Sequence, residues 1–327
     1  MISSVTVRIV AGSIAVYLGV AGVLVAFGTA SLPDTEAESL AFDELRLDYA
    51  ALPKLQGFNA RDGTELSYRS YPADSELVLV LLHGSGWHSR YLYPLANHLS
   101  DNGIAQVVTP DLRGHGERPK RRGDIDYQDQ LEDDLADLLA ELRRRQPQAR
   151  IVVGGHSSGG GLAIRFAGSQ YGNQVDGYLL LAPFLRYDAP TVRPNSGGWA
   201  RPFTPRIIGL SMFERVGIDR FSHLPAIAFD MPKPYRDGTE TLTYSYRLMM
   251  GFAPRHYRQD LAAISQPTLL LIGSEDEAFV AEQFKPTVEP LLEADIRVLP
   301  GLSHMGVVVS EDVRSVVETW LGQLPPP

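Results

Sequence analysis

The chain has 327 residues, of which 44% are hydrophobic, so it has room for a sizeable core in one large α/β domain with an insertion or in two ordinary domains. Its net charge of −9 argues against a nucleic-acid partner, because such a partner requires a basic face. The one basic cluster, residues 118–123 (RPKRRG), is interpreted as a solvated loop. The absence of cysteine excludes disulfides, thiolate metal sites and cysteine catalysis.

The N-terminal segment predicts a membrane helix. Residues 9–30 carry no charge, and at a rise of about 1.5 Å per residue they would cross a hydrocarbon layer about 30 Å thick. This run exceeds the apolar part of a cleaved signal peptide, which favours a retained signal anchor. Arg8 precedes the run and acidic residues follow it, so residues 1–8 are expected in the cytoplasm and the remainder across the membrane. The alternative is a secreted protein, cleaved near Ala30.

The segments that follow predict an α/β fold. Residues 31–52 are mixed and acidic and are interpreted as a tether, and residues 58–71 indicate two strands about an Asp62-Gly63 turn. Apolar strands are then predicted at residues 77–84, 104–111, 150–155, 177–183, 267–273 and 296–301. Helical periodicity separates or follows them at residues 90–103, 131–142 and 312–324. Apolar strands that alternate with amphipathic helices predict a mostly parallel sheet covered on both faces.

The alternation is interrupted once, at residues 184–261. This segment is rich in proline, glycine and aromatic residues and shows no strand periodicity, so it is interpreted as a helical cap inserted between two core segments, residues 53–183 and 262–327. The apolar side chains of the cap would either line a pocket for an acyl chain or form the cap's own core. They are Phe203, Met212, Phe213, Phe221, Phe229, Tyr244, Tyr246, Met249, Met250 and Phe252.

The residues that follow the apolar strands carry the candidate chemistry. In an open α/β sheet, ligands meet the carboxyl ends of the strands. The loops at those ends contain His83-Gly84-Ser85-Gly86, Gly155-x-Ser157-x-Gly159, Ser274-Glu275-Asp276 and Ser303-His304. A serine, an acid, a histidine and a glycine-rich loop are therefore predicted at one edge of the sheet.

This set of side chains suits nucleophilic catalysis. A serine hydroxyl needs a base to take its proton, an acid to orient that base, and N–H donors for the developing oxyanion. The glycines around Ser157 suit a sharp strand-to-helix turn, and a flexible linker is disfavoured because helix-forming residues follow at once. Chain order then selects His304, and Asp276 is preferred to Glu275 and Glu277 as the acid.

Five segments together resemble a known family: LLHGSG, TPDLRGHGERP, GGHSSGGG, GSEDEAF and GLSHMG. They are similar to the α/β-hydrolase fold, and most similar to its monoacylglycerol lipase and lysophospholipase-like branch, the serine-aminopeptidase-type hydrolases. The resemblance covers about residues 53–183 and 262–327. It implies Ser157 as nucleophile, Asp276 as orienting acid and His304 as base, with the backbone N–H groups of Ser85 and Ser158 as the oxyanion hole, and neither cofactor nor metal ion.

The expected function is that of a serine hydrolase acting on carboxylic esters through an acyl-enzyme. An anchor beside a bilayer favours lipid-like esters such as lysophospholipids or monoacylglycerols, with the ester and the membrane as partners. Thioesterase, lactonase, peptidase and acyltransferase activities stay open, because they use the same residues. A different class of function, a membrane-tethered binding protein with an inactive hydrolase fold, is disfavoured because all three residues are present.

Overall fold

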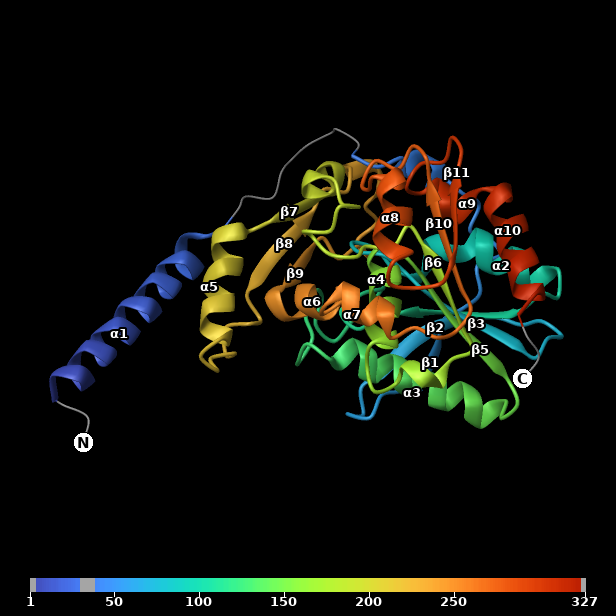
Figure 1. Ribbon diagram of the computed structural model, residues 1–327. Helices are drawn as coiled ribbons and strands as arrows, with labels where there is room; N and C mark the ends of the chain where they lie inside the picture. Colours follow the sequence, from blue (N-terminus) through green and yellow to red (C-terminus); the bar gives the residue numbers. More distant parts are fainter. Residues whose placement is uncertain (1–3, 30–38, 325–327) are drawn as a thin grey trace.

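An eight-stranded, mostly parallel sheet forms the centre of the molecule (Figure 1). The computed structural model describes residues 4–29 and 39–324. Only the pairs β1–β2 and β2–β4 are antiparallel within this sheet. Its strands, in spatial order, are β1 (Gln56–Asn59), β2 (Glu65–Tyr71), β4 (Gln106–Asp111), β3 (Leu77–Leu82), β5 (Arg150–His156), β6 (Gly177–Leu181), β10 (Thr268–Gly273) and β11 (Asp295–Leu299). The predicted strands are thus confirmed.

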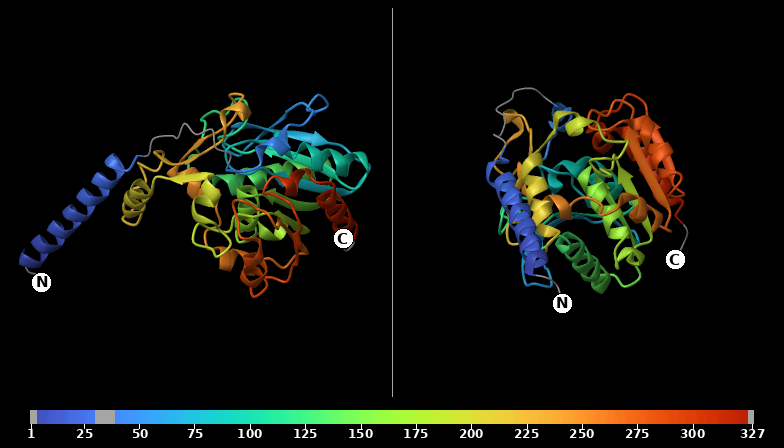
Figure 2. Two further views of the ribbon diagram at one scale, coloured as in Figure 1. Left: turned by 90° about the horizontal axis from the view of Figure 1, so that it is seen from above. Right: turned by 60° about the vertical axis from the view of Figure 1, so that its left-hand side comes forward.

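Helices cover both faces of this sheet (Figures 1 and 2). One layer contains α2 (Tyr93–Asp101), α9 (Gly306–Val309) and α10 (Glu311–Gly322), and the other contains α3 (Gln130–Arg145), α4 (Ser158–Ala167) and α7 (Tyr257–Ala262). A further short helix, α8 (Phe284–Val288), lies between β10 and β11 in the chain. Because both faces are covered, β3 and β10 are buried along their whole length, which explains their unbroken apolar sequences.

The inserted segment differs from the expected helical cap in one respect: it also contains a three-stranded antiparallel sheet. Its elements are β7 (Ala200–Pro202), α5 (Thr204–Glu214), β8 (Pro225–Phe229), β9 (Thr243–Ser245) and α6 (Tyr246–Gly251). The strands have three to five residues, and prolines lie in two of them. Such strands are too short to show a period of two, so their pairing depends on segments that are distant in the chain.

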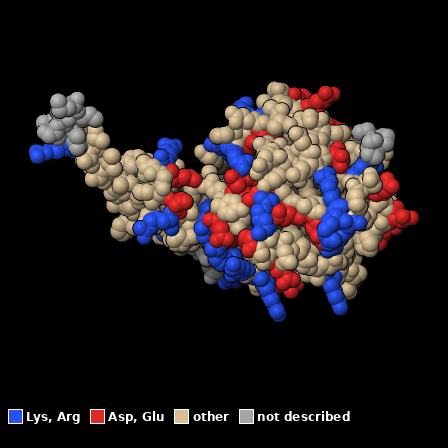
Figure 3. All heavy atoms as spheres, turned by 90° about the horizontal axis from the view of Figure 1, so that it is seen from below, with Lys and Arg blue, Asp and Glu red and all other residues tan. Residues whose placement is uncertain are grey.

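The N-terminal helix α1 (Ser4–Phe27) projects from the body and contacts the cap helix α5 near its own C-terminal end (Figures 1 and 2). Among the described residues it is the one helix that is long and apolar enough to cross a membrane, over Val10–Phe27, and a signal sequence would meet the same criterion. Figure 3 shows basic and acidic side chains interspersed over one face of the body, whereas the arm formed by α1 is uncharged along most of its length.

Part of the expected tether packs on the core instead of remaining a linker. Residues 30–38 lie outside the described residues, but Leu40, Phe42 and Leu45 are each at most 3% exposed and belong to the main hydrophobic core. We call residues 39–46 the strap; it includes a short 3-10 helix, Phe42–Leu45. Acidic residues surround these three apolar side chains in the sequence, so the local pattern does not indicate that they are buried. Their burial depends on contacts with the cap and the core. The basic cluster at 118–123 is a largely exposed loop, as predicted.

Candidate active site

Ser157 occupies a strained turn between β5 and α4. Its φ of 55° and ψ of −121° lie outside the conformations that most residues adopt, at a cost on the order of 1–3 kcal/mol. The flanking glycines make this turn possible. A Cβ atom on Gly155 would lie 2.3 Å from the backbone of Gly159, and one on Gly159 would lie 2.4 Å from the carbonyl oxygen of Leu82. The turn therefore holds the serine at the carboxyl end of β5, where α4 begins.

Asp276 and His304 form a buried, hydrogen-bonded pair. They follow β10 and β11, are 1% and 2% exposed, and lie 2.8 Å apart between Oδ2 of the aspartate and Nδ1 of the histidine. The second carboxylate oxygen accepts bonds from the backbone N–H groups of Ala278 (2.9 Å) and Phe279 (2.7 Å). Because an ionised carboxylate only accepts, the proton is assigned to Nδ1 and Nε2 carries a free lone pair.

The other two acids near Asp276 take different positions. Glu277 accepts a bond from the backbone N–H of His304 at 2.8 Å, so it contacts this histidine through the main chain and not through the ring. Glu275 is exposed. Of the three adjacent acids that the sequence offers, Asp276 is therefore the one hydrogen-bonded to the imidazole of His304.

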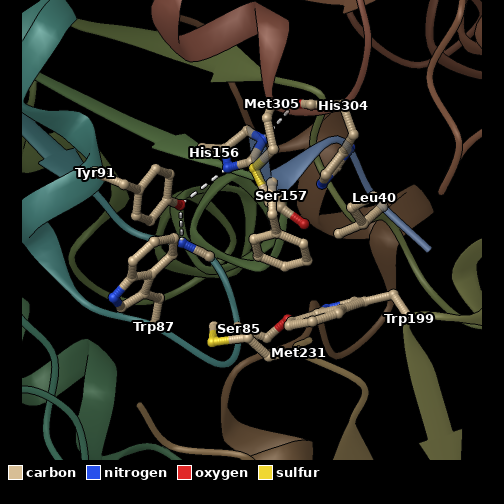
Figure 4. A pocket seen from close by; sticks show the side chains of 12 residues that line it. Leu40, Ser85, Trp87, Tyr91, His156, Ser157, Trp199, Met231, His304 and Met305 are labelled. Carbon is tan, nitrogen blue, oxygen red and sulfur yellow. Dashed lines mark hydrogen bonds between the residues drawn. The ribbon is translucent and has the colours of Figure 1, made fainter. Parts of the chain in front are cut away.

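Ser157 and His304 line one small pocket (Figure 4). Figure 4 shows the serine hydroxyl and the imidazole on the same side of the pocket, with Leu40 beside His304. The pocket has a volume of about 10 Å³, which is room for about one water molecule. The lining residues are Leu40, Phe42, Gly84, Ser85, Trp87, Tyr91, His156, Ser157, Trp199, Met231, His304 and Met305.

The glycine-rich loop after β3 approaches the serine closely. A Cβ atom on Gly84 would lie 3.1 Å from the Cβ of Ser157, so the backbone here is near the serine side chain. The hydroxyl of Ser85 accepts a bond from the indole N–H of Trp199 at 3.1 Å, which ties the loop to the cap. Ser158 is the first residue of α4, and N–H groups in the first turn of a helix have no carbonyl partner within that helix.

His156, next to Ser157 in the chain, joins two of the site's loops. Its Nε2 donates to the carbonyl of His304 at 3.0 Å, and its Nδ1 accepts from the hydroxyl of Tyr91 at 2.9 Å. That hydroxyl in turn accepts from the N–H of Gly84 at 2.6 Å. Burial, and then the proximity of His304, lowers the pKa of His156 well below its usual value, which keeps it neutral. The sequence indicates packing for His156 and contains no local signal for Tyr91.

The apolar cap residues pack within the cap and against its neighbours. None of the ten that the sequence singles out is among the residues that line this pocket. Within the described chain, Phe203 is buried outside both hydrophobic clusters, and the other nine belong to the main core, to the cap's core with α1, or to the surface. Trp199 and Met231 are the cap side chains that reach the pocket. In the described part of the chain, no three histidine, aspartate or glutamate side chains form a group that could hold a metal ion.

Known proteins are similar to this chain over most of their length. The chain is similar to a non-heme haloperoxidase of Rhodococcus erythropolis, with 27% identity over 77% of this chain and 94% of that protein. It is similar to monoglyceride lipase of Saccharomyces cerevisiae, with 24% identity over 77% of this chain and 86% of the relative. Among solved structures, the monoacylglycerol lipase of Paleococcus ferrophilus matches with a TM-score of 0.62 and 21% identity, over 79% of this chain and 99% of the other.

The family described as "Serine aminopeptidase, S33" matches residues 73–307. That region contains the parallel strands, the serine turn, the inserted cap, and the loops that carry Asp276 and His304. The chain therefore belongs to the serine aminopeptidase, S33 family of α/β-hydrolases.

Proposed function

We propose that this protein hydrolyses carboxylic esters through an acyl-enzyme, with Ser157 as nucleophile, His304 as base and Asp276 as the acid that orients the base. The observation that supports this proposal is the pocket that Ser157 and His304 share. The serine lies in a strained turn, and Nδ1 of the imidazole is hydrogen-bonded to the buried carboxylate of Asp276. That combination leaves Nε2 of His304 as the one proton acceptor needed for a serine nucleophile.

The reaction follows from these positions. The hydroxyl oxygen of Ser157 attacks the acyl carbonyl carbon while its proton passes to Nε2 of His304. The carbonyl oxygen becomes an oxyanion, for which the backbone N–H groups of Ser85 and Ser158 are the proposed donors. The C–O bond to the alcohol then breaks, and the alcohol leaves with the proton from His304. Water attacks the acyl-enzyme in the same way, which frees the acid and restores the serine.

Lipid-like esters, such as monoacylglycerols or lysophospholipids, are the proposed substrates. Two of the similar proteins are named as monoglyceride or monoacylglycerol lipases. The pocket is lined mainly by apolar and aromatic side chains, which suits an acyl chain better than a peptide. An apolar N-terminal helix would also hold the site beside a bilayer, where such esters are found.

We further propose that α1 is a retained anchor and not a cleaved signal, with the catalytic domain on the extracytoplasmic side. The C-terminal half of α1 shares a small core with the cap: Ala21 and Val25 are buried against Leu210 and Phe213. The close approach depends on Gly209, where a Cβ atom would lie 2.7 Å from the carbonyl oxygen of Ala21. Cleavage near residue 30 would release α1 and expose this core to water.

Polar contacts support the same packing. The hydroxyl of Tyr17 donates to the carbonyl of Met212 at 3.0 Å. The guanidinium of Arg206 donates to the carbonyl of Val25 at 3.0 Å, near the end of α1, where carbonyl groups have no partner within the helix. These contacts connect α1 to the cap that covers the catalytic pocket.

The catalytic proposal is tested with a fluorophosphonate, which labels an activated serine covalently. We expect labelling of the full chain, and its loss in Ser157→Ala, together with loss of hydrolysis of p-nitrophenyl esters. Ser265→Ala is the matched control, because this serine is exposed and does not line the pocket. Labelling that persists in Ser157→Ala would reject the serine assignment, and a wild-type chain that neither reacts nor hydrolyses any ester would favour the inactive binding protein.

A further inference from the structure

The strap, residues 39–46, lies against the catalytic pocket although it precedes the region that matches the family. Leu40 and Phe42 are 2% and 1% exposed and both line the pocket that contains Ser157 and His304. Figure 4 shows Leu40 next to His304. The chain that follows the proposed anchor therefore supplies part of the active-site wall.

Aromatic contacts from the core and from the cap hold Phe42 in place. The centroid of its ring lies 6.2 Å from that of Trp87, in the loop after β3. It lies 5.4 Å from the ring of Trp199 and 5.4 Å from that of Tyr235, which are both cap residues. Phe42 thus fills the space where core, cap and catalytic pocket meet.

Hydrogen bonds tie the strap to the two loops that carry the acid and the base. The N–H of Ala41 donates to Oε1 of Glu277 at 3.0 Å, while Oε2 of the same carboxylate accepts from the N–H of His304 at 2.8 Å. The hydroxyl of Ser303 donates to the carboxylate of Glu44 at 2.9 Å. The strap is therefore hydrogen-bonded to the residue that follows Asp276 and to the residue that precedes His304.

From this placement we propose that the strap is a specificity-determining part of the acyl-binding site, and that the ring of Phe42, with Leu40 beside it, limits the length of acyl chain that the pocket accepts. The inference rests on the proposed ester hydrolysis and adds its acyl-chain selectivity. The physical reason is space: a pocket of about 10 Å³ gains room for an acyl chain wherever an apolar side chain of its wall becomes smaller. Phe42 is such a side chain.

The same contacts make Glu277 a positioning residue for His304. One carboxylate accepts bonds from the strap and from the backbone of the base, so it holds the histidine loop at a fixed distance from the strap. It acts through the backbone N–H and has no contact with the ring of His304 among the hydrogen bonds of the described residues.

The test of the strap uses a series of p-nitrophenyl esters from acetyl to dodecanoyl. We expect Phe42→Ala to raise kcat/KM for the decanoyl ester relative to the acetyl ester by about tenfold over wild type, which corresponds to about two more buried methylene groups. Phe42→Leu, a smaller change, should give a smaller shift in the same direction. Asp43→Ala is the matched control: its side chain is exposed on the same turn, and we expect the wild-type chain-length profile.

The outcomes separate this inference from the proposed function. If wild type hydrolyses esters and folded Phe42→Ala and Phe42→Leu keep its chain-length profile, the inference is wrong while the proposed function stands. If wild type hydrolyses no ester and is not labelled by the fluorophosphonate, both fall. Circular dichroism during heating shows whether each variant folds, and Phe42→Leu, which keeps an apolar side chain in place, carries the test if Phe42→Ala does not fold.

Glu277→Gln tests the positioning role by a separate readout. A carboxamide keeps one acceptor oxygen but turns an N–H group toward one of the two backbone donors, so one bond is lost. We expect kcat to fall about tenfold for every acyl length with KM nearly unchanged, since misplacement of a catalytic group slows the chemical step. Glu275→Gln is the matched control, an exposed neighbour with the same change in charge. An unchanged kcat, or a loss confined to long chains, would contradict the positioning role.

Discussion

The buried carboxylate of Asp276 has each of its oxygens committed. One accepts two backbone N–H groups, and the other accepts the Nδ1 proton of His304. This arrangement fixes both the orientation of the imidazole and its tautomer. The role that we propose for this residue therefore depends on its acceptor character more than on its shape.

Asp276→Asn changes only that character. The amide would present N–H groups to Nδ1 and favour the wrong tautomer, so we expect kcat to fall by up to ~10⁴ while the folded structure persists. Ester hydrolysis and fluorophosphonate labelling rates measure the loss, and thermal unfolding monitors the fold. An Asp276→Asn variant with wild-type kcat would show that another group orients the base.

The proposed base gives a second prediction at this scale. The imidazole of His304 must be uncharged to take the proton of Ser157, so a protonated ring at low pH would stop the reaction. We expect kcat/KM for p-nitrophenyl butyrate to rise from acid to neutral pH and then level off. Rates are measured at constant ionic strength, and a profile that stays flat from pH 5 to 8 would contradict a histidine base.

Among the elements, the contact between α1 and α5 is the observation that favours our proposal of a retained anchor over a cleaved signal. A signal peptide needs no partner in the folded protein, whereas here Gly209 admits α1 against the cap and the two helices bury apolar side chains from each other. The rest of α1 keeps an exposed apolar surface, including Val16 and Val23 at 68% and 58% exposed, which suits lipid more than water.

Cell fractionation tests the anchor. We expect the full chain in the membrane fraction, and the chain that begins after residue 30 in the soluble fraction or in aggregates, because α5 loses its partner. N-terminal sequencing of the purified full-length protein should find residues 1–30 still attached. A mature protein that begins near residue 31 would favour secretion.

Gly209→Val tests the packing itself. The added methyl groups would collide with Ala21 and Val25 of α1, so we expect a lower Tm, corresponding to roughly 1–3 kcal/mol, while the protein stays in the membrane fraction. Gly12→Val in α1 is the matched control, because no heavy atom lies within 4 Å of the added carbon there. Equal Tm values for wild type and Gly209→Val would show that α1 does not pack on the cap.

For the whole molecule, buried neutral histidines tie stability to pH. Nδ1 of His83 donates to the carbonyl of Gly84 at 2.8 Å and its Nε2 accepts from the N–H of Leu112 at 3.1 Å, a pattern that only the neutral ring allows. Burial lowers the pKa of His83 to about 4. The unfolded chain therefore binds this proton more readily, so the stabilising contribution of His83 is full above pH 6.5 and is lost as pH falls toward 4.

Other buried groups act in the opposite direction. Burial raises the pKa of Asp134 to about 6, although Arg113 contacts this carboxylate. The stabilising contribution of Asp134 to the free energy of unfolding is therefore full below pH 3.8 and is lost as pH rises through 6. The free energy of unfolding of the whole chain therefore contains contributions that rise and contributions that fall with pH. A comparison of wild type with single variants separates the histidine contribution from the others.

His83→Gln isolates the histidine contribution. Between pH 7 and pH 5 we expect wild type to lose roughly 2 kcal/mol more free energy of unfolding than His83→Gln, since glutamine does not titrate. Urea unfolding at the two pH values measures this difference. His223→Gln, with its ring at an exposed position, is the control and should follow wild type. Equal losses for wild type and His83→Gln would contradict a neutral buried ring.

The sequence by itself determined the order of the core strands along the chain, the turn around Ser157, and the loops that contain Asp276 and His304. These features depend on local pattern: an apolar strand, a pair of flanking glycines, or a polar residue at the end of a strand can each be recognised within about ten residues. The sheet then needs only its strand order to bring such loops to one edge.

The tertiary structure alone decided which acid contacts the imidazole, that His156 and Tyr91 join two loops, that the cap contains strands, and that the strap closes the pocket. In each case the partners are far apart in the chain, as for Ala41 and Glu277, which are 236 positions apart. Periodicity carries no information about such pairs, because a buried apolar or polar side chain looks the same in the sequence whichever surface it meets. The packing of the strap could not be predicted from the sequence for this reason. Phe42 is an apolar residue in an acidic segment, and only the folded cap and core create the space that it fills.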